Sequence, residues 1–147
     1  MKIVVGVDGS PYGSAAVDFV RGATWPKDTQ VLVISAATPA VVMAPEAYVP
    51  AEVYTEALKA QLDAHRTFAG AAVEKLRAAG LTVDGRAVQD DPRSALLDAV
   101  TDQHADLLVV GSHGRAGLAK LVLGSVASHV VTHAPCNVLV VKLPPRG

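Results

Sequence analysis

The amino-acid sequence predicts an α/β fold, an open, doubly wound, five-stranded parallel sheet with helices on both faces. Three observations carry this prediction. Five short runs rich in Val, Ile and Leu have the even hydrophobicity of strands buried on both faces. Each connection between these runs contains a helical pattern, as parallel strands require. With 147 residues, half of them hydrophobic, the chain has the size and apolar content of a single domain, expected over residues 1–147.

The N-terminal part predicts a strand, a helix and a second strand. Residues 3–7 form a β-branched run that ends at Asp8-Gly9-Ser10. Ser10 as N-cap, followed by Pro11, starts a helix that is expected to end at Trp25-Pro26. Residues 31–34 form the second buried strand.

The central part predicts one long helix between a loop and a third strand. Residues 37–50 contain three prolines and are expected to form the loop. The helix is expected over residues 51–79, with Gly80 as its C-cap, and residues 81–88 follow as a strand. A coiled coil would need larger residues along its seam, which favours a helix lying on a sheet. The inward face of the helix steps by three and four residues through Leu58, Leu62, His65, Ala69, Ala72 and Leu76.

The C-terminal part repeats the same alternation. Asp91 as N-cap, followed by Pro92 at the first helical position, starts a helix. Residues 107–110 form the fourth strand, and a glycine-punctuated loop follows over residues 111–124. A helix is then expected over Ser125–His133 and the last strand over residues 137–142, before a polar tail.

Composition excludes several partners. The chain has 13 Lys and Arg against 14 Asp and Glu, scattered along the sequence, and 4% aromatic residues, so no nucleic-acid partner is expected. No apolar run approaches the roughly 20 residues of a membrane span, and no signal peptide is apparent. The one cysteine, Cys136, has no intrachain partner, which fits a reducing compartment. We therefore expect a cytoplasmic protein without membrane contacts.

Two turns are candidates for a ligand site. In doubly wound sheets, ligands bind at the carboxyl ends of strands, here Asp8-Gly9-Ser10 and the loop that begins at Gly111. The loop leads to Gly124-Ser125 at a helix N-terminus, where unpaired N–H groups favour anions. This pattern predicts a phosphate cradle, although ordinary turn glycines with a serine N-cap explain the same spacing equally well. Neither a Walker loop nor a Gly-x-Gly-x-x-Gly fingerprint occurs.

These segments resemble the universal stress protein family. Gly111-x-x-Gly114, nine residues, and then Gly124-Ser125 is similar to the family's nucleotide-binding signature. Residues 4–10, 106–115 and 135–141 resemble its first, fourth and last strands with their turns. The resemblance covers nearly the whole chain, and the loop over residues 37–50 is its least typical part.

The resemblance implies strand order 3-2-1-4-5, a homodimer and ATP as ligand, with Mg²⁺ or Mn²⁺ on the phosphates. It implies that Asp8 contacts the adenosine part and that the Ala36 backbone contacts adenine. The phosphate and ribose cradle would be Gly111, Gly114, Gly124 and Ser125. With their neighbours in both turns, the expected nucleotide-binding residues are Asp8, Gly9, Ser10, Ala36, Gly111, Ser112, His113, Gly114, Arg115, Gly124, Ser125 and Val126.

The remaining polar candidates have simpler readings. His113 and Arg115 are placed to neutralise phosphate, with solvent exposure as the alternative. His129 and His133 have the i, i+4 spacing of some zinc sites, but no third ligand is evident, so no metal site of the protein's own is expected. Cys136 is expected to be a small apolar residue, not a nucleophile.

The leading functional hypothesis is an ATP-binding stress-response regulator, a nucleotide-dependent sensor or switch that acts as a homodimer. The alternatives are a slow ATPase or phosphotransferase in the same pocket, a phosphoacceptor receiver-like domain, and a structural dimer without ligand. No dedicated base is evident, so we expect no catalytic residue and at most slow hydrolysis or autophosphorylation. In order 3-2-1-4-5 the last strand, Asn137–Val141, is an edge without charge or proline, which predicts a homodimer through this strand. The sequence identifies no protein partner.

Overall fold

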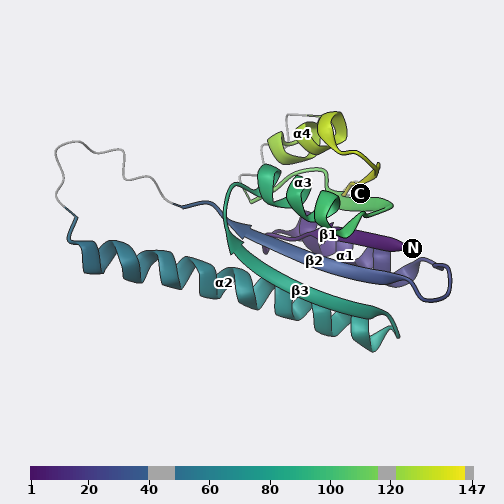
Figure 1. Ribbon diagram of the computed structural model, residues 1–147, viewed down its shortest axis with the longest axis horizontal. Helices are drawn as coiled ribbons and strands as arrows, with labels where there is room; N and C mark the ends of the chain where they lie inside the picture. Colours follow the sequence, from purple (N-terminus) through teal and green to yellow (C-terminus); the bar gives the residue numbers. More distant parts are fainter. Residues whose placement is uncertain (40–48, 116–121, 145–147) are drawn as a thin grey trace.

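The computed structural model describes residues 1–39, 49–115 and 122–144. Five parallel strands form one sheet in the order β3-β2-β1-β4-β5, as the family resemblance implies. Figure 1 shows β3, β2 and β1 side by side. The strands alternate with four helices along the chain. The elements are β1 (Lys2–Gly6), α1 (Pro11–Gly22), β2 (Gln30–Ala37), α2 (Ala51–Ala78), β3 (Thr82–Gln89), α3 (Pro92–Gln103), β4 (Leu107–Gly111), α4 (Ser125–His133) and β5 (Asn137–Val141).

Two apolar layers cover the two faces of the sheet. Alternate strand residues, such as Val5 and Val33, pack with α1 and α2, whereas Val4 and Leu32 pack with α3 and α4. Figure 1 shows α2 and α3 on opposite sides of the sheet. The central strand β1 is buried by both layers, and its Val4 and Val5 are fully inaccessible. The carboxyl end of β1 therefore lies at the middle of the sheet edge.

The helix starts follow the expected capping chemistry. The Ser10 hydroxyl accepts a hydrogen bond from the Gly13 N–H at 3.1 Å, and the Asp91 carboxylate accepts one from the Arg93 N–H at 2.8 Å. Helix α2 ends at Ala78 with Ala79 as its C-cap, one residue before the C-cap that the sequence predicts. The expected Gly80 follows in the left-handed region, with φ of 88°.

Several boundaries differ from the prediction. Helix α1 ends at Gly22, before the expected stop, because the backbone of Ala23 is extended. The Trp25 indole N–H donates to the Val20 carbonyl of the last turn at 2.8 Å. Strand β2 extends to Ala37 because β3 pairs with it along its full length. Most of the loop expected over 37–50, namely residues 40–48, lies outside the described residues, as do residues 116–121 of the loop expected over 111–124. Among the described helices, none has the length and hydropathy needed to span a membrane.

Candidate functional site

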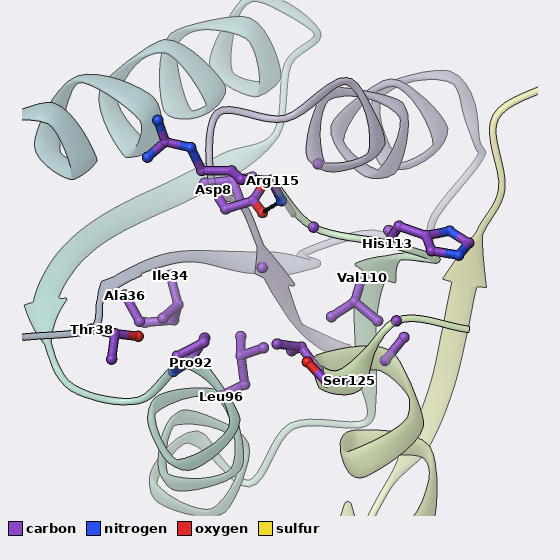
Figure 2. A pocket seen from close by; sticks show the side chains of 18 of the residues that line it. Asp8, Ile34, Ala36, Thr38, Pro92, Leu96, Val110, His113, Arg115 and Ser125 are labelled. Carbon is purple, nitrogen blue, oxygen red and sulfur yellow. Dashed lines mark hydrogen bonds between the residues drawn. The ribbon is translucent and has the colours of Figure 1, made fainter. Parts of the chain in front are cut away.

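A cavity of about 470 Å³ lies where the carboxyl ends of β1, β2 and β4 meet (Figure 2). This is the point at which the strand order reverses, since β1 lies between β2 and β4. Nine of the twelve expected site residues line the cavity. They are Asp8, Ala36, Gly111, His113, Gly114, Arg115, Gly124, Ser125 and Val126.

Asp8 joins the two loops that the sequence places at this edge. One carboxylate oxygen accepts the Ser10 N–H at 3.0 Å, and the other accepts the Arg115 N–H at 3.0 Å. These bonds link the turn after β1 to the loop after β4. Each carboxylate oxygen retains lone pairs for a ligand, because an ionised carboxylate has about four acceptor positions.

The loop after β4 closes tightly onto the start of α4. The Gly124 N–H donates to the Ser112 carbonyl at 2.7 Å, and a Cβ on Gly124 would lie 3.1 Å from the His113 Cα. Glycine is favoured there, because a side chain would push against backbone atoms. Gly124 is itself the N-cap of α4 and provides no side-chain cap, whereas Ser125 is the first helical residue. The first-turn N–H groups of α4 therefore have no side-chain acceptor from the cap, and the helix end is suited to an anion.

The backbone of Ala36 faces the same cavity. The Val7 N–H donates to the Ile34 carbonyl at 3.0 Å, so Ile34 presents its backbone to β1. Two residues later, Ala36 presents its N–H and C=O to the same side, where β1 has ended. The Val7 carbonyl, which would continue the ladder, accepts the Ser35 hydroxyl at 2.9 Å instead. Ala36 thus offers one donor and one acceptor to the cavity.

Apolar side chains complete the end of the cavity near Ala36. Ile34 and Ala36 approach from β2, Pro92 and Leu96 from the first turns of α3, and Val110 from β4 (Figure 2). The sequence assigns Pro92 and Leu96 to a helix start and to the core, and nothing in their local pattern indicates a ligand site. Their role arises only when α3 folds over the sheet edge.

Three expected site residues do not line the cavity but shape the turns around it. Gly9 has a φ of 78°, and a Cβ there would lie 2.6 Å from the Phe68 ring. Ser10 is 5% exposed and caps α1. Ser112 is 2% exposed, with its hydroxyl 3.0 Å from the His113 Nδ1.

The two cationic candidates point away from the start of α4. The Arg115 guanidinium lies 5.5 Å from the Phe68 ring centroid, on the α2 side. The His113 ring stacks at a tilt on Tyr12, with 5.1 Å between centroids, and Figure 2 shows it directed toward β5. Arg115 contributes its backbone N–H to the site through Asp8.

Sequence reasoning missed the wall that α2 contributes. Gln61 and His65 line the cavity, and the Gln61 amide donates to the Thr38 carbonyl at 2.8 Å. The signal in the sequence is His65, which interrupts the apolar stripe of a long helix. A buried polar side chain in such a stripe needs a partner from another element.

Comparison with known proteins identifies the family. The model of the universal stress protein family matches residues 1–142. A universal stress protein of Mycolicibacterium smegmatis is 34% identical over 145 residues, which cover 99% of this chain and 98% of that protein. This chain belongs to the universal stress protein family. A universal stress protein of Thermus aquaticus is 30% identical over 146 residues, covering 95% of this chain and 97% of that protein.

Several solved structures share the fold. The hypothetical protein MJ0577 superimposes with a TM-score of 0.85 at 23% identity, covering 99% of this chain and 97% of that chain. A universal stress protein solved in complex with cAMP gives a TM-score of 0.64 at 26% identity, covering 97% and 96%. An Arabidopsis thaliana member with AMP bound gives 0.66 at 19% identity, covering 98% and 92%. The expected α/β fold and its strand order are thus confirmed.

Proposed function

We propose that this universal stress protein binds an adenine nucleotide in the cavity at the carboxyl ends of β1, β2 and β4. The expected ligand is ATP, and the nucleotide sets the state of a homodimer in a stress-related regulatory role. The observation that carries the proposal is the convergence of three ligand groups on one cavity. They are the open backbone edge of Ala36, the carboxylate of Asp8 and the N-terminus of α4.

Each group suits a different part of the ligand. The donor and acceptor of Ala36 match the N1 and 6-amino edge of adenine, and the neighbouring apolar side chains suit its faces. The Asp8 carboxylate accepts from ribose hydroxyls, a role that an acidic residue at another strand end fills in dinucleotide-binding sheets. The first turn of α4 receives the phosphates, with the Ser125 hydroxyl as a further donor.

Relatives support the chemical class of the ligand. The family member solved with cAMP is 26% identical to this chain. AMP and dAMP stand in two further family structures at lower identity. Adenine on a pentose that carries at least one phosphate is the part common to these ligands and ATP.

A divalent cation, Mg²⁺ or Mn²⁺, would be held mainly by the phosphates. Among the described residues no group of three His, Cys, Asp or Glu side chains is placed to hold a metal. Mg²⁺ commonly binds through phosphate oxygens and waters with few protein ligands, which fits this cavity.

Turnover is expected to be slow. Ser125, at the start of α4, lines the cavity, whereas Ser112 in the preceding loop is buried outside it. Autophosphorylation would therefore fall on Ser125. The receiver-like alternative would need a pair of carboxylates at the site. Asp91 does not serve as one of them, because it caps α3 and pairs with Arg93 at 2.8 Å.

The homodimer is proposed to form through β5. Among the described residues this strand pairs only with β4, and its apolar residues 138–141 are half-buried. The Val141 carbonyl accepts the Ser112 N–H at 2.8 Å, so Val141 presents its backbone to β4. Val140 presents its backbone to the open edge, because successive residues of a strand alternate. A second copy of β5 would pair there in antiparallel register.

Two measurements test this proposal. Mass spectrometry of the heat-released fraction of the purified protein is expected to find an adenine nucleotide. Calorimetric titration with ATP, AMP and cAMP is expected to give saturable binding at one site per chain. If all three ligands give no saturable binding, the proposed function is wrong. The cytoplasmic location remains part of the proposal and is tested by cell fractionation.

A further inference from the structure

His65 of α2 is a buried histidine on the wall of the cavity. Its side chain is 5% exposed, and its Nδ1 lies 2.8 Å from the Ser35 hydroxyl oxygen. Ser35 is fully buried and lies 2.9 Å from the Val7 carbonyl oxygen. These three groups form a chain from β1 through β2 to α2.

The chain of hydrogen bonds fixes the tautomer of His65. The Val7 carbonyl is only an acceptor, so the single hydroxyl proton of Ser35 is donated to it. The hydroxyl oxygen must then accept from His65, which places the ring proton on Nδ1. The Nε2 of the neutral ring is therefore an acceptor with a free lone pair.

The Nε2 atom opens to the cavity. No other described residue forms a hydrogen bond with Nε2. Within the described part of the chain, every fully buried side-chain nitrogen or oxygen has a hydrogen-bond partner, so an atom without one is not fully buried. Nε2 is therefore accessible, and the cavity is the space that His65 lines. An acceptor held in this way suits an N–H or O–H donor of a ligand.

The surroundings favour the neutral form of the ring. Burial lowers the pKa of His65 below its ordinary value of 6.5, and the positive charge of Arg115 lowers it further. The carboxylate of Asp8 opposes this shift. Asp8 lies in the turn after β1 and Arg115 in the loop after β4, so charges from both loops affect the pKa of His65.

We propose that His65 is a specificity-determining residue of the nucleotide site, whose Nε2 accepts a hydrogen bond from an N–H or O–H donor on the nucleoside part of the ligand. This inference rests on the proposed function and names a contact within it. Two donors qualify, the 6-amino group of adenine and a ribose hydroxyl. The phosphates are excluded as partners of Nε2, because ionised phosphate oxygens only accept.

The matched substitution is His65→Asn. The asparagine amide nitrogen stands close to where Nδ1 was, so it still donates to Ser35, but nothing replaces Nε2. Affinity for adenosine is expected to fall by between about threefold and tenfold, as for one hydrogen bond of ordinary net strength. The same factor is expected for AMP, because the contact does not involve phosphate. His104→Asn, at an exposed position on the opposite sheet edge with a φ of 50° that asparagine tolerates, is the control and is expected to bind as wild type.

The pH profile separates this contact from a purely structural role. The wild-type affinity for adenosine is expected to be constant above pH 6.5 and to fall as the pH drops below it, because protonation removes the acceptor. The His65→Asn variant is expected to give a weaker and flat profile. Nitrogen NMR of the wild-type imidazole, which needs no variant, is expected to show the Nδ1–H tautomer and a shift of Nε2 on adenosine binding.

Analogues identify the donor. Purine riboside lacks the 6-amino group, and 2′-deoxyadenosine and 3′-deoxyadenosine each lack one hydroxyl. The analogue that lacks the relevant donor is expected to bind wild type more weakly than adenosine does, and to bind His65→Asn as adenosine does. Adenosine and AMP binding that is unchanged in His65→Asn, with the wild-type pH profile, overturns the inference but leaves the proposed function intact. Absence of saturable binding of ATP, AMP and cAMP to wild type contradicts the proposed function itself.

Discussion

Gly114 gives the sharpest test of the phosphate cradle, because a side chain there meets Asp8. A Cβ on Gly114 would lie 3.0 Å from the Asp8 carboxylate oxygen that accepts the Arg115 N–H. Ordinary contact begins at 3.4 Å, so the carboxylate must move by about 0.4 Å in Gly114→Ala. Gly114→Val adds two further methyl groups to the same space.

The contacts of Gly114 determine the expected changes in folding stability and ATP affinity. Weakening one solvent-exposed hydrogen bond to a carboxylate costs about 1 kcal/mol of folding free energy. Alanine also restricts the unfolded chain more than glycine does, which stabilises the folded state by about 0.4–1 kcal/mol. The two effects nearly cancel, so Gly114→Ala is expected to fold with nearly wild-type stability. Its affinity for ATP is expected to fall by about threefold to tenfold. Gly114→Val is expected to lose more than about tenfold, or 1.4 kcal/mol of binding free energy.

Gly70→Ala is the matched control. Gly70 lies in the exposed part of α2, and a Cβ there meets no atom within 4 Å. This variant is expected to bind ATP as wild type does and to gain up to about 1 kcal/mol of folding stability from helix propensity. Isothermal calorimetry with thermal melts of all four proteins measures both quantities. If folded Gly114→Val binds ATP with wild-type affinity, the cradle lies elsewhere.

Four further outcomes are expected. Asp8→Ala should weaken adenosine and ATP by the same factor in calorimetry, because its proposed contact is not to phosphate; a loss confined to ATP would contradict this role. Val140→Pro should weaken the dimer in sedimentation, because it removes an N–H from the open edge of β5. Val140→Thr keeps that N–H and should remain dimeric. A monomeric wild type at micromolar concentration would refute the interface. The Arg93 guanidinium lowers the pKa of Asp91 from 3.8 to about 2. About 1 kcal/mol of capping stability should therefore be present above pH 3.8 and be lost as the pH falls toward 2. The acid unfolding of Asp91→Asn should lack this component. Steady ATP hydrolysis should stay below about 1 per second, and a faster rate would make the chain an enzyme of ordinary kinase speed.

Local sequence patterns were sufficient to predict the elements and their order. The strand ends depended on neighbours instead. Ser35 and Ala36 have small side chains with no strand preference of their own, and they extend β2 because β3 pairs with them. This extension positions Ala36, for which the sequence suggested a ligand contact only through a family resemblance.

The site was predictable where it consists of turns and not where it consists of packing. Glycine spacing and a helix start located the loops around Asp8 and Gly114. The walls from α2 and α3 depend on which helix faces cross the sheet edge, a tertiary property that no local pattern contains. His65 belongs to this second group, since its partner Ser35 lies 30 positions away in the sequence.

Amide NMR during a titration with ATP tests the central claim most directly, because it reports binding and its location together. The account predicts saturable shifts for Ala36, Gly111, Gly114 and Ser125, which line the cavity. Amides at the opposite edge of the sheet, such as Asp84 and Gln103, should remain unchanged. Shifts confined to that opposite edge, or no saturable shifts at all, would contradict the account.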